Sequence, residues 1–242
     1  MNKIILIILS IICVKNSYTQ DLLILANSNY EKEEYEKSIT LYDSLLSLGY
    51  NNYELYYNLG NCYYKKREWA NAIWHYEKSL KIKKDERIIQ NIVLTKLMII
   101  DKIESIPQLF YKRWWINIYS LFSTKSWQII SISCIWIYFL LIMLSSFINI
   151  NFPIFNKSIL LIAFLSAIFA YSSFYNTILQ KEGIMFSPST VVYSAPTDNS
   201  TNLFSLHPGT KIKIIDRIGD WTNLKLSNGN SGWVKHTTFR EL

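Results

Sequence analysis

The residues that most often carry catalysis or bind metals are few and scattered in this sequence. Histidine occurs at His75, His207 and His236, and none of them has a Cys, Asp or Glu cluster at the spacing of metal ligands. The sequence also has no phosphate-binding glycine loop and no nucleophile elbow. We therefore expect a protein that is not an enzyme, with no catalytic residues, no metal site and no cofactor.

The cysteines add little to this picture. Cys13 lies in an apolar N-terminal run, Cys134 lies in a second apolar run, and Cys62 stands alone in a more polar region. Because each is in a different kind of segment, no internal disulfide is expected. The chemistry left to the chain is non-covalent recognition, which depends on the elements that position tyrosine, asparagine and tryptophan side chains.

The first of these elements is an internal repeat between Asp21 and about Met98. Residues about 34 positions apart, a spacing that we call the repeat length, are similar in type. The matching pairs are Leu25/Leu59, Ala26/Gly60, Tyr35/Trp69, Ser38/Ala72, Ile39/Ile73, Tyr42/Tyr76 and Leu46/Leu80. The paired small residues are where two helices approach closely, and the paired tyrosines fill the space between units. The pattern predicts two units of two helices each, at about 20–52 and 53–84, within a helical region at 20–100.

The second unit resembles the tetratricopeptide repeat. The family's signature spacing is met by Tyr56, Leu59-Gly60, Tyr63, Ala72, Tyr76 and Leu80. The match has departures, since the proline that usually closes each repeat is absent and Asn29 takes the place of Tyr63 in the first unit. Such repeats bind peptides or partner proteins along the concave face of their first helices.

By this resemblance, six positions line the partner-binding concave face: Leu23, Asn27, Tyr30, Tyr57, Asn61 and Tyr64. The alternative is that they are ordinary surface residues of a small helical stack. Leu23 stands where some members of the family have the lysine of a carboxylate clamp. The resemblance therefore implies a partner helix or extended segment with apolar contacts rather than an acidic tail.

A further helix is predicted to begin at Asp85-Glu86, where carboxylates suit a helix N-terminus. Shifted by one repeat length, its Leu94 falls on Gly60, so a large residue replaces a small one. We interpret this segment as a capping helix that covers the apolar face of the last repeat.

Two long uncharged runs follow, Trp127–Ile148 and Ser158–Leu179, and each is long enough to cross a bilayer. They predict an antiparallel transmembrane hairpin, with a buried soluble helix pair as the alternative. The segment 101–126 repeats an aromatic or apolar residue every four positions from Phe110 to Phe122. We expect an interfacial amphipathic linker there, and the alternative is a partner-binding helix.

Residues 1–19 have the pattern of a signal peptide, with Lys3 before the apolar run Ile4–Val14. An uncleaved anchor and a lipoprotein signal at Cys13 are alternatives. The export signal predicts a bacterial inner-membrane protein with two spans and both terminal domains in the periplasm. The basic residues that flank the hairpin on the side taken as external are Lys112, Arg113, Lys125 and Lys181, so the positive-inside rule favours the reverse orientation.

The net charge of +7 is diffuse, and no nucleic-acid partner is expected.

After Gly183 the pattern changes to short alternating strands separated by turns. The motifs of 184–242 resemble, in order, those of a bacterial SH3-like domain: Tyr193-Ser194-Ala195-Pro196, Leu206-His207-Pro208-Gly209-Thr210, Gly219-Asp220-Trp221, Asn228-Gly229 and Gly232-Trp233-Val234. His207 is expected to serve a turn. Tyr193, Trp221 and Trp233 are candidate ligand contacts, although a role in the barrel core is favoured for the two tryptophans. Bacterial relatives often bind peptidoglycan or peptides.

The order of all these parts resembles the BatE-type tetratricopeptide proteins of the Bacteroides aerotolerance (Bat) operon. The expected fold class is a multidomain membrane protein: all-α helical repeats, a two-helix transmembrane hairpin and a C-terminal all-β SH3-like barrel. The resemblance implies partners among other Bat-operon membrane proteins, which carry von Willebrand A domains, and a link to oxidative or envelope stress. That link raises a redox-sensing role for Cys62, against which simple packing is favoured.

Two hypotheses for the function follow. In the first, the protein is a non-enzymatic inner-membrane scaffold or adaptor that binds partner proteins through its periplasmic repeats. In the second, it is an envelope module that binds peptidoglycan through the SH3-like domain.

Overall fold

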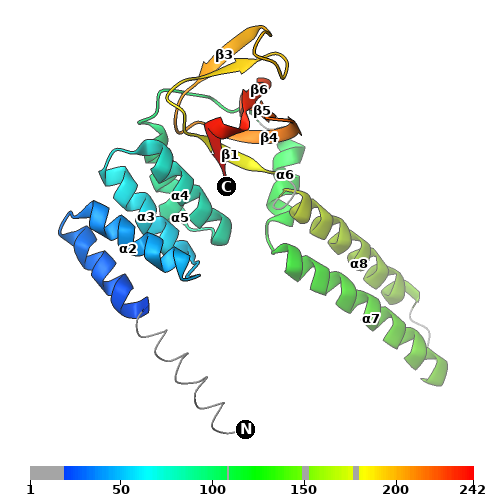
Figure 1. The fold of residues 1–242 in the computed structure, drawn as a ribbon. Helices are drawn as coiled ribbons and strands as arrows, with labels where there is room; N and C mark the ends of the chain where they lie inside the picture. The colour runs from blue at the N-terminus through cyan, green and yellow to red at the C-terminus, as the bar shows by residue number, and fades with distance from the viewer. Residues whose placement is uncertain (1–18, 108, 149–152, 177–179) are drawn as a thin grey trace. The chain divides into compact units, whose positions relative to one another are not determined.

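The computed structural model describes residues 19–107, 109–148, 153–176 and 180–242 of the chain. The predicted signal peptide falls almost wholly on residues 1–18, outside this part. The described chain forms two compact units (Figure 1). One contains the N-terminal helices to Glu104 together with Glu182–Leu242, and the other is Ser105–Lys181.

The N-terminal half of the first unit consists of helices: α1 (residues 19–31), α2 (Tyr35–Ser47), α3 (Tyr53–Lys65), α4 (Trp69–Ile82) and α5 (Glu86–Lys96). The side chain of Asn52 caps α3 by accepting a hydrogen bond from Leu55 N, and Asp85 caps α5 by accepting one from Arg87 N. α5 thus begins at the predicted Asp85-Glu86.

Contacts within the helical hairpins recur at the predicted repeat length. Tyr42 Oη donates to Asn27 Oδ1 at 2.5 Å, and Tyr76 Oη donates to Asn61 Oδ1 at 2.8 Å. The turns also match, since Glu33 and Arg67 have φ of 61° and 62°. The predicted two-helix unit is therefore present twice.

The small residues of the repeat lie where the helices approach most closely. In the first hairpin, Ser38 Oγ of α2 donates to the carbonyl oxygen of Ala26 at 2.8 Å. In the second, a Cβ added to Gly60 would lie 2.5 Å from two ring atoms of Tyr76 in α4. The second helix of each hairpin thus covers the same face of the first.

The helix α5 has one buried and one exposed apolar face. Ile88, Ile92 and Thr95 are buried against the second hairpin, as expected of a helix that covers it. The outer face, however, exposes Leu94 and its neighbours. A capping helix normally presents a polar outer face, so the capping interpretation accounts for only half of α5.

The C-terminal part of this unit is an antiparallel seven-stranded sheet with the order β3-β2-β6-β5-β4-β1-β7. The strands are β1 (Glu182–Met185), β2 (Thr190–Tyr193), β3 (Asn202–Leu206), β4 (Lys211–Ile218), β5 (Trp221–Lys225), β6 (Ser231–Lys235) and β7 (Phe239–Glu241). The core is formed by Met185, Val192, Leu206, Ile212, Leu224, Leu226, Val234 and Phe239. These side chains come from one face of each alternating strand.

The helices and the sheet pack against each other, although the hairpin segment separates them in sequence. A shared apolar cluster contains Trp69, Ala70, Ile73 and Trp74 of α4, Ile99 after α5, and Ile184, Phe186 and Leu242. In addition, Trp74 Nε1 donates to the carbonyl oxygen of Glu241 at 2.9 Å. The strands at this contact are β1 and β7.

Buried ion pairs reinforce this contact. Glu77 of α4 is 4% exposed, and its carboxylate lies 2.8 Å from the ammonium group of Lys211 in β4. Lys211 also pairs with Glu182 at 3.0 Å. Burial lowers the pKa of Lys211, but the two carboxylates outweigh this and raise it above its ordinary value. Lys211 is therefore charged at neutral pH.

A second polar contact joins the segment after α5 to the sheet through Asp101. Its carboxylate accepts from His207 N at 2.7 Å and from Thr210 Oγ1 at 2.5 Å, and lies 2.8 Å from His207 Nδ1. Burial would raise the pKa of Asp101, but the hydrogen bonds from Thr210 and His207 lower it overall. His207, expected to serve a turn, thus also binds the segment after α5.

This geometry predicts an acid-sensitive contact. Because the folded pKa of Asp101 lies below the unfolded value, its contribution is present above about pH 4 and is lost as the pH falls through the folded pKa. We expect Asp101→Asn to lower the free energy of unfolding by about 1–3 kcal/mol at pH 7 and by less at low pH. Urea unfolding between pH 3 and 7 measures the difference. Asp198→Asn, which breaks an exposed pair with Lys235, is the control and should stay near wild type. A pH-independent loss in Asp101→Asn would contradict the prediction.

The second unit contains α6 (Phe110–Tyr119), α7 (Thr124–Ile148) and α8 (Pro153–Phe174). By length and composition, α7 and α8 are each able to cross a membrane. α8 begins at Pro153, earlier than the predicted Ser158, so Lys157 lies in the helix rather than in the loop. The earlier start has a physical reason, because proline suits the first helical position.

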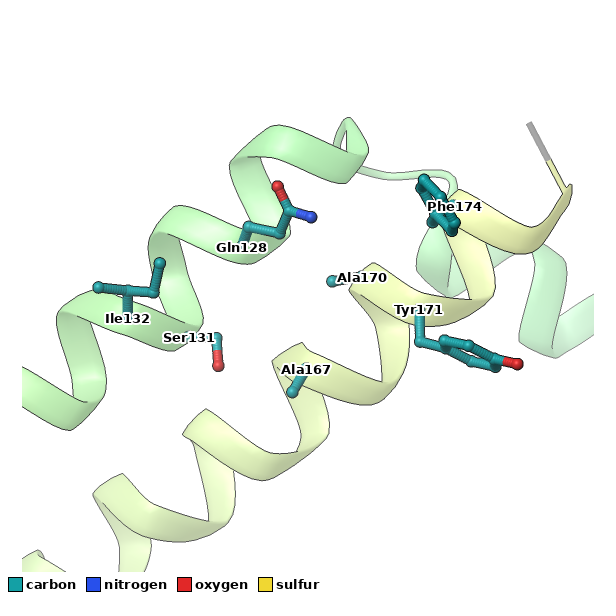
Figure 2. Close-up of a pocket in the computed structure, with 7 residues that line it drawn as sticks. All are labelled: Gln128, Ser131, Ile132, Ala167, Ala170, Tyr171 and Phe174. Atoms are coloured by element: carbon teal, nitrogen blue, oxygen red, sulfur yellow. The ribbon is translucent and has the colours of Figure 1, made fainter. Parts of the chain in front are cut away.

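Polar side chains join α7 and α8 at two positions along the helix pair. Thr124 Oγ1 lies 2.8 Å from Ser173 Oγ, and Ser131 Oγ donates to the carbonyl oxygen of Ala163 at 3.0 Å. A hollow of about 390 Å³ lies between the two helices. Figure 2 shows the residues that line it: Gln128, Ser131, Ile132, Ala167, Ala170, Tyr171 and Phe174. In α6, Trp115 packs on Phe169 of α8 with ring centroids 5.1 Å apart.

Candidate functional site

A groove runs along the first helices of the two hairpins, α1 and α3. It consists of two adjoining cavities of about 290 and 200 Å³. Tyr30 and Asn61 line both cavities, Asn27 lines the first and Tyr64 lines the second. The structure therefore brings these four of the predicted positions together in one groove.

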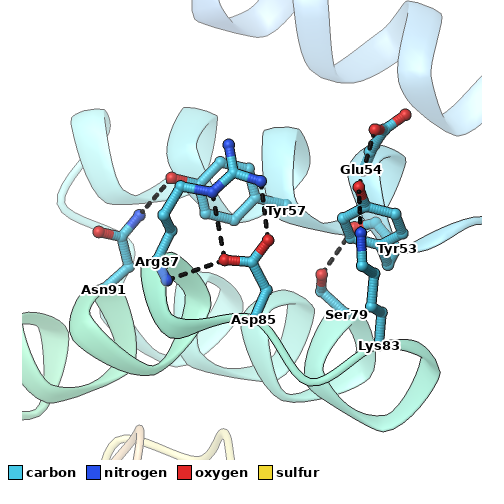
Figure 3. A network of polar contacts seen from close by, with 8 residues as sticks. All are labelled: Tyr53, Glu54, Tyr57, Ser79, Lys83, Asp85, Arg87 and Asn91. Carbon is cyan, nitrogen blue, oxygen red and sulfur yellow. Dashed lines mark hydrogen bonds and ion pairs between the residues drawn. The ribbon is translucent and has the colours of Figure 1, made fainter.

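The other two predicted positions are placed differently. Leu23 packs, partly buried, against the core of the first hairpin. The hydroxyl of Tyr57 accepts a hydrogen bond from Asn91 Nδ2 at 3.2 Å, and the Arg87 guanidinium lies 5.8 Å from its ring (Figure 3). Because α5 covers Tyr57 in this way, that side chain packs against α5 and is not among the residues that line the groove.

Sequence reasoning missed several residues that line the groove: Glu31, Tyr42, Asn58, Lys65, Tyr76, Asn91 and Leu94. A signal for Asn91 was available, since a second shift by the repeat length places it on Tyr57. No such signal existed for Asn58, because its place in the groove depends on the packing of α3 against α1, where its Nδ2 donates to Asn27 Oδ1 at 3.4 Å.

The amides in the groove are oriented by tyrosines. The Oδ1 atoms of Asn27 and Asn61 accept from Tyr42 and Tyr76, so their Nδ2 groups are the ends directed to donate elsewhere. Burial raises the pKa of Tyr42 to about 12 and also raises that of Tyr76. Both phenols therefore remain protonated and keep donating at any physiological pH.

The groove has almost no net charge. Its only charged lining residues are Glu31 and Lys65, one of each sign. Amide donors and aromatic rings around a neutral hollow suit the backbone carbonyls and apolar side chains of a peptide segment. A site for a highly charged ligand would need several like charges, which these two cavities do not have.

Two potentially reactive side chains of the helical hairpins, Cys62 and His75, are buried. Cys62 is fully buried, with Sγ 3.5 Å from Ser38 Oγ, and burial raises the pKa of its thiol to about 11. This burial favours the packing interpretation of Cys62 over redox sensing. His75 is also buried, and burial lowers its pKa to about 3, so it is neutral. Among the described residues, no group of three or more His, Cys, Asp or Glu side chains could hold a metal ion.

An aromatic face lies on the sheet. Tyr193, Trp221 and Trp233 are half-buried on the outer side of β2, β5 and β6 and do not belong to the core cluster. The rings of Tyr193 and Trp221 meet edge to face at 5.4 Å. The core role favoured for the two tryptophans is therefore wrong: the strand register turns both away from the interior.

The motif order of this sheet agrees with one family. Residues 188–239 match the family model of the bacterial SH3 domain. A search of curated proteins found no match to the chain. The match begins after β1, so Glu182–Met185, which contacts α4 through Ile184, lies outside the matched residues.

Proposed function

We propose that the protein is a non-enzymatic, membrane-anchored adaptor that binds a segment of a partner protein in the groove between Asn27 and Tyr64. The single observation that carries this proposal is the continuous, neutral hollow that Tyr30 and Asn61 share between the two hairpins. The recurrence of contacts at the repeat length supports the assignment of these hairpins as tetratricopeptide repeats.

In this proposal, the membrane topology follows from the packing of the N-terminal helices against the SH3 domain within the first unit. Its helices precede the hairpin and its SH3 domain follows it, and the two are packed together. If α7 and α8 cross a membrane, both parts therefore lie on the same side. Bacterial SH3 domains that bind peptidoglycan work outside the cytoplasm, which supports a periplasmic side. By its resemblance to the Bat proteins, the adaptor would hold partners with von Willebrand A domains.

The proposal is tested by site-specific photo-crosslinking in the full chain in native membranes. A photoreactive residue replacing Asn58 should form an adduct with the partner, and Tyr30→Ala with Tyr64→Ala should abolish it. Tyr50→Ala is the matched control, because Tyr50 is 40% exposed at the turn between the hairpins and lies outside the groove. An adduct that persists in the groove variant, with folding unchanged by circular dichroism, would refute the proposal.

A second candidate function rests on the aromatic face of the SH3 domain. Beside its rings, Asn223 Oδ1 is buried without a hydrogen-bond partner among the described residues, in register with Trp233. Stacking rings next to an unpaired acceptor suit a polar ligand such as peptidoglycan. Co-sedimentation of the solubilised full chain with purified sacculi tests this. Trp221→Ala should reduce the bound fraction, whereas Ile215→Ala, an exposed change in β4, should not.

A further inference from the structure

The two cavities of the groove are built from equivalent residues of the two hairpins. Four lining residues of the first cavity recur in the second at the repeat length, as the pairs Asn27/Asn61, Tyr30/Tyr64, Glu31/Lys65 and Tyr42/Tyr76. The facing walls also correspond. α3 supplies Asn58 and Asn61 to the first cavity, and α5 supplies Asn91 and Leu94 to the second, each pair with the i, i+3 spacing of neighbours on one helix face. We call the cavity of Glu31 the first subsite and that of Lys65 the second subsite.

The two subsites have opposite charges at one equivalent position. Glu31 is the last residue of α1, and Lys65 is the last residue of α3. Neither side chain has a hydrogen bond or an ion pair within the described part of the chain. A helix C-terminus carries a partial negative charge, which favours Lys65 but disfavours Glu31. The helix itself therefore gives no reason for a carboxylate at this end of the groove.

The neighbouring side chains add to the difference between the subsites. In the first subsite, Asn58 Nδ2 donates to Asn27 Oδ1 at 3.4 Å, so Asn58 Oδ1 remains as a second acceptor besides the Glu31 carboxylate. In the second, Leu94 takes the place in the wall that Asn61 has in the first, and it is 50% exposed. The first subsite thus suits a basic side chain, and the second suits an acidic group next to an apolar one.

We propose that the groove selects an extended partner segment with a basic residue in the first subsite, and an acidic residue with an apolar neighbour in the second. This inference rests on the proposed function, because it names the chemistry of the segment that the groove binds. Packed helices lie about 8–10 Å apart, and an extended chain advances about 3.3 Å per residue. The two charged residues of the segment are therefore about three positions apart. Opposite charges at the two ends fix the direction in which the segment lies.

Selection of random peptides displayed on phage tests the pattern, with the solubilised full chain as the target. Only peptides that fail to bind the chain with Tyr30→Ala and Tyr64→Ala count, provided that circular dichroism shows this variant to be folded. We expect these groove-dependent peptides to be enriched in a basic residue about three positions from an acidic residue with an apolar neighbour.

Charge reversal assigns each end of a selected peptide to its subsite. Glu31→Lys should weaken binding of the synthesised peptide by about three- to tenfold in fluorescence anisotropy, because an attraction becomes a repulsion. Replacing the basic residue of the peptide with glutamate should weaken binding to the wild-type chain and restore it to the Glu31→Lys chain. Lys65→Glu should behave in the same way towards the acidic residue of the peptide.

The turns after α1 and α3 provide matched controls. Glu33 and Arg67 are equivalent, have φ of 61° and 62°, and line neither subsite. Glu33→Arg changes the charge by as much as Glu31→Lys, and Arg67→Glu by as much as Lys65→Glu. Each control places at one turn a charge that the equivalent turn already carries, and each should leave the affinity within about twofold of wild type.

The outcomes separate this inference from the proposed function. If no selected peptide distinguishes the wild-type chain from the Tyr30→Ala, Tyr64→Ala chain, the groove does not bind peptides and both are wrong. If groove-dependent peptides lack the charge pattern, or if Glu31→Lys and Glu33→Arg weaken binding equally, the selection by charge is wrong and the proposed function stands.

Discussion

Replacing Glu77 with alanine should lower the free energy of unfolding of the helix and SH3 unit by about 3–5 kcal/mol. The reason is that Lys211 is partly buried between two carboxylates, Glu77 and Glu182. Without Glu77, the ammonium group keeps its burial but loses its closest partner. Chemical unfolding of the solubilised chain measures the loss, and hydrogen exchange in β1 and β4 locates it.

The matched control separates the loss of a charge from the loss of packing. Glu77→Gln keeps the shape of the side chain but leaves Lys211 with only Glu182, so it should destabilise nearly as much. Adding Lys211→Met to Glu77→Leu removes the ammonium group and its closest partner, and it leaves only Glu182, whose side chain is 22% exposed, without that partner. The double variant should therefore recover most of the stability, because an apolar pair of similar volume often replaces a buried ion pair without loss. A double variant as unstable as Glu77→Ala would show that the charges themselves are not the main contribution.

This ion pair also marks the limit of what the sequence predicts. Local signals located the helices, because caps, small residues and paired tyrosines act within one hairpin. Turn residues and alternation located the strands of the SH3 domain for the same reason. In the sequence, however, Glu77 comes before the hydrophobic hairpin segment and Lys211 comes after it. Nothing in the local pattern of either residue identifies the other, so the docking of the two parts was not predicted.

The candidate sites also divide into features that the sequence predicted and features that depend on tertiary packing. The resemblance to the tetratricopeptide repeat placed Asn27, Tyr30, Asn61 and Tyr64 on one face, and the structure brings these four into one groove. The resemblance could not show that α5 covers Tyr57, since that depends on how closely α5 approaches α3. For Trp221 and Trp233, the resemblance to bacterial SH3-like domains favoured the core, whereas strand register decides which face a residue occupies. Register depends on pairing with other strands and was not evident from the residues themselves.

The second large effect is expected at Gly209, in the turn before β4. Its φ of +92° disfavours any side chain, and a Cβ would lie 2.5 Å from Ile99 Cγ2 and 3.4 Å from Ile73 Cδ1. Gly209→Ala thus combines backbone strain of about 1–2 kcal/mol with overpacking of about 1–3 kcal/mol. We expect unfolding at a clearly lower urea concentration and faster hydrogen exchange on both sides of the contact.

Gly49 provides the control, because its φ is +84° and an added Cβ would meet nothing within 4 Å. Gly49→Ala should therefore show the strain alone, and the difference between the two variants measures how tightly the SH3 domain is held against α4. In an Ile99→Ala background, which is itself less stable because Ile99 is buried, Gly209→Ala should add a smaller loss than it does in the wild-type chain, since the truncation makes room for the new methyl group. Equal losses of unfolding free energy in Gly49→Ala and Gly209→Ala would mean that the contact between the SH3 domain and α4 accommodates the added methyl group without loss of stability. The helices and the SH3 domain would then move independently.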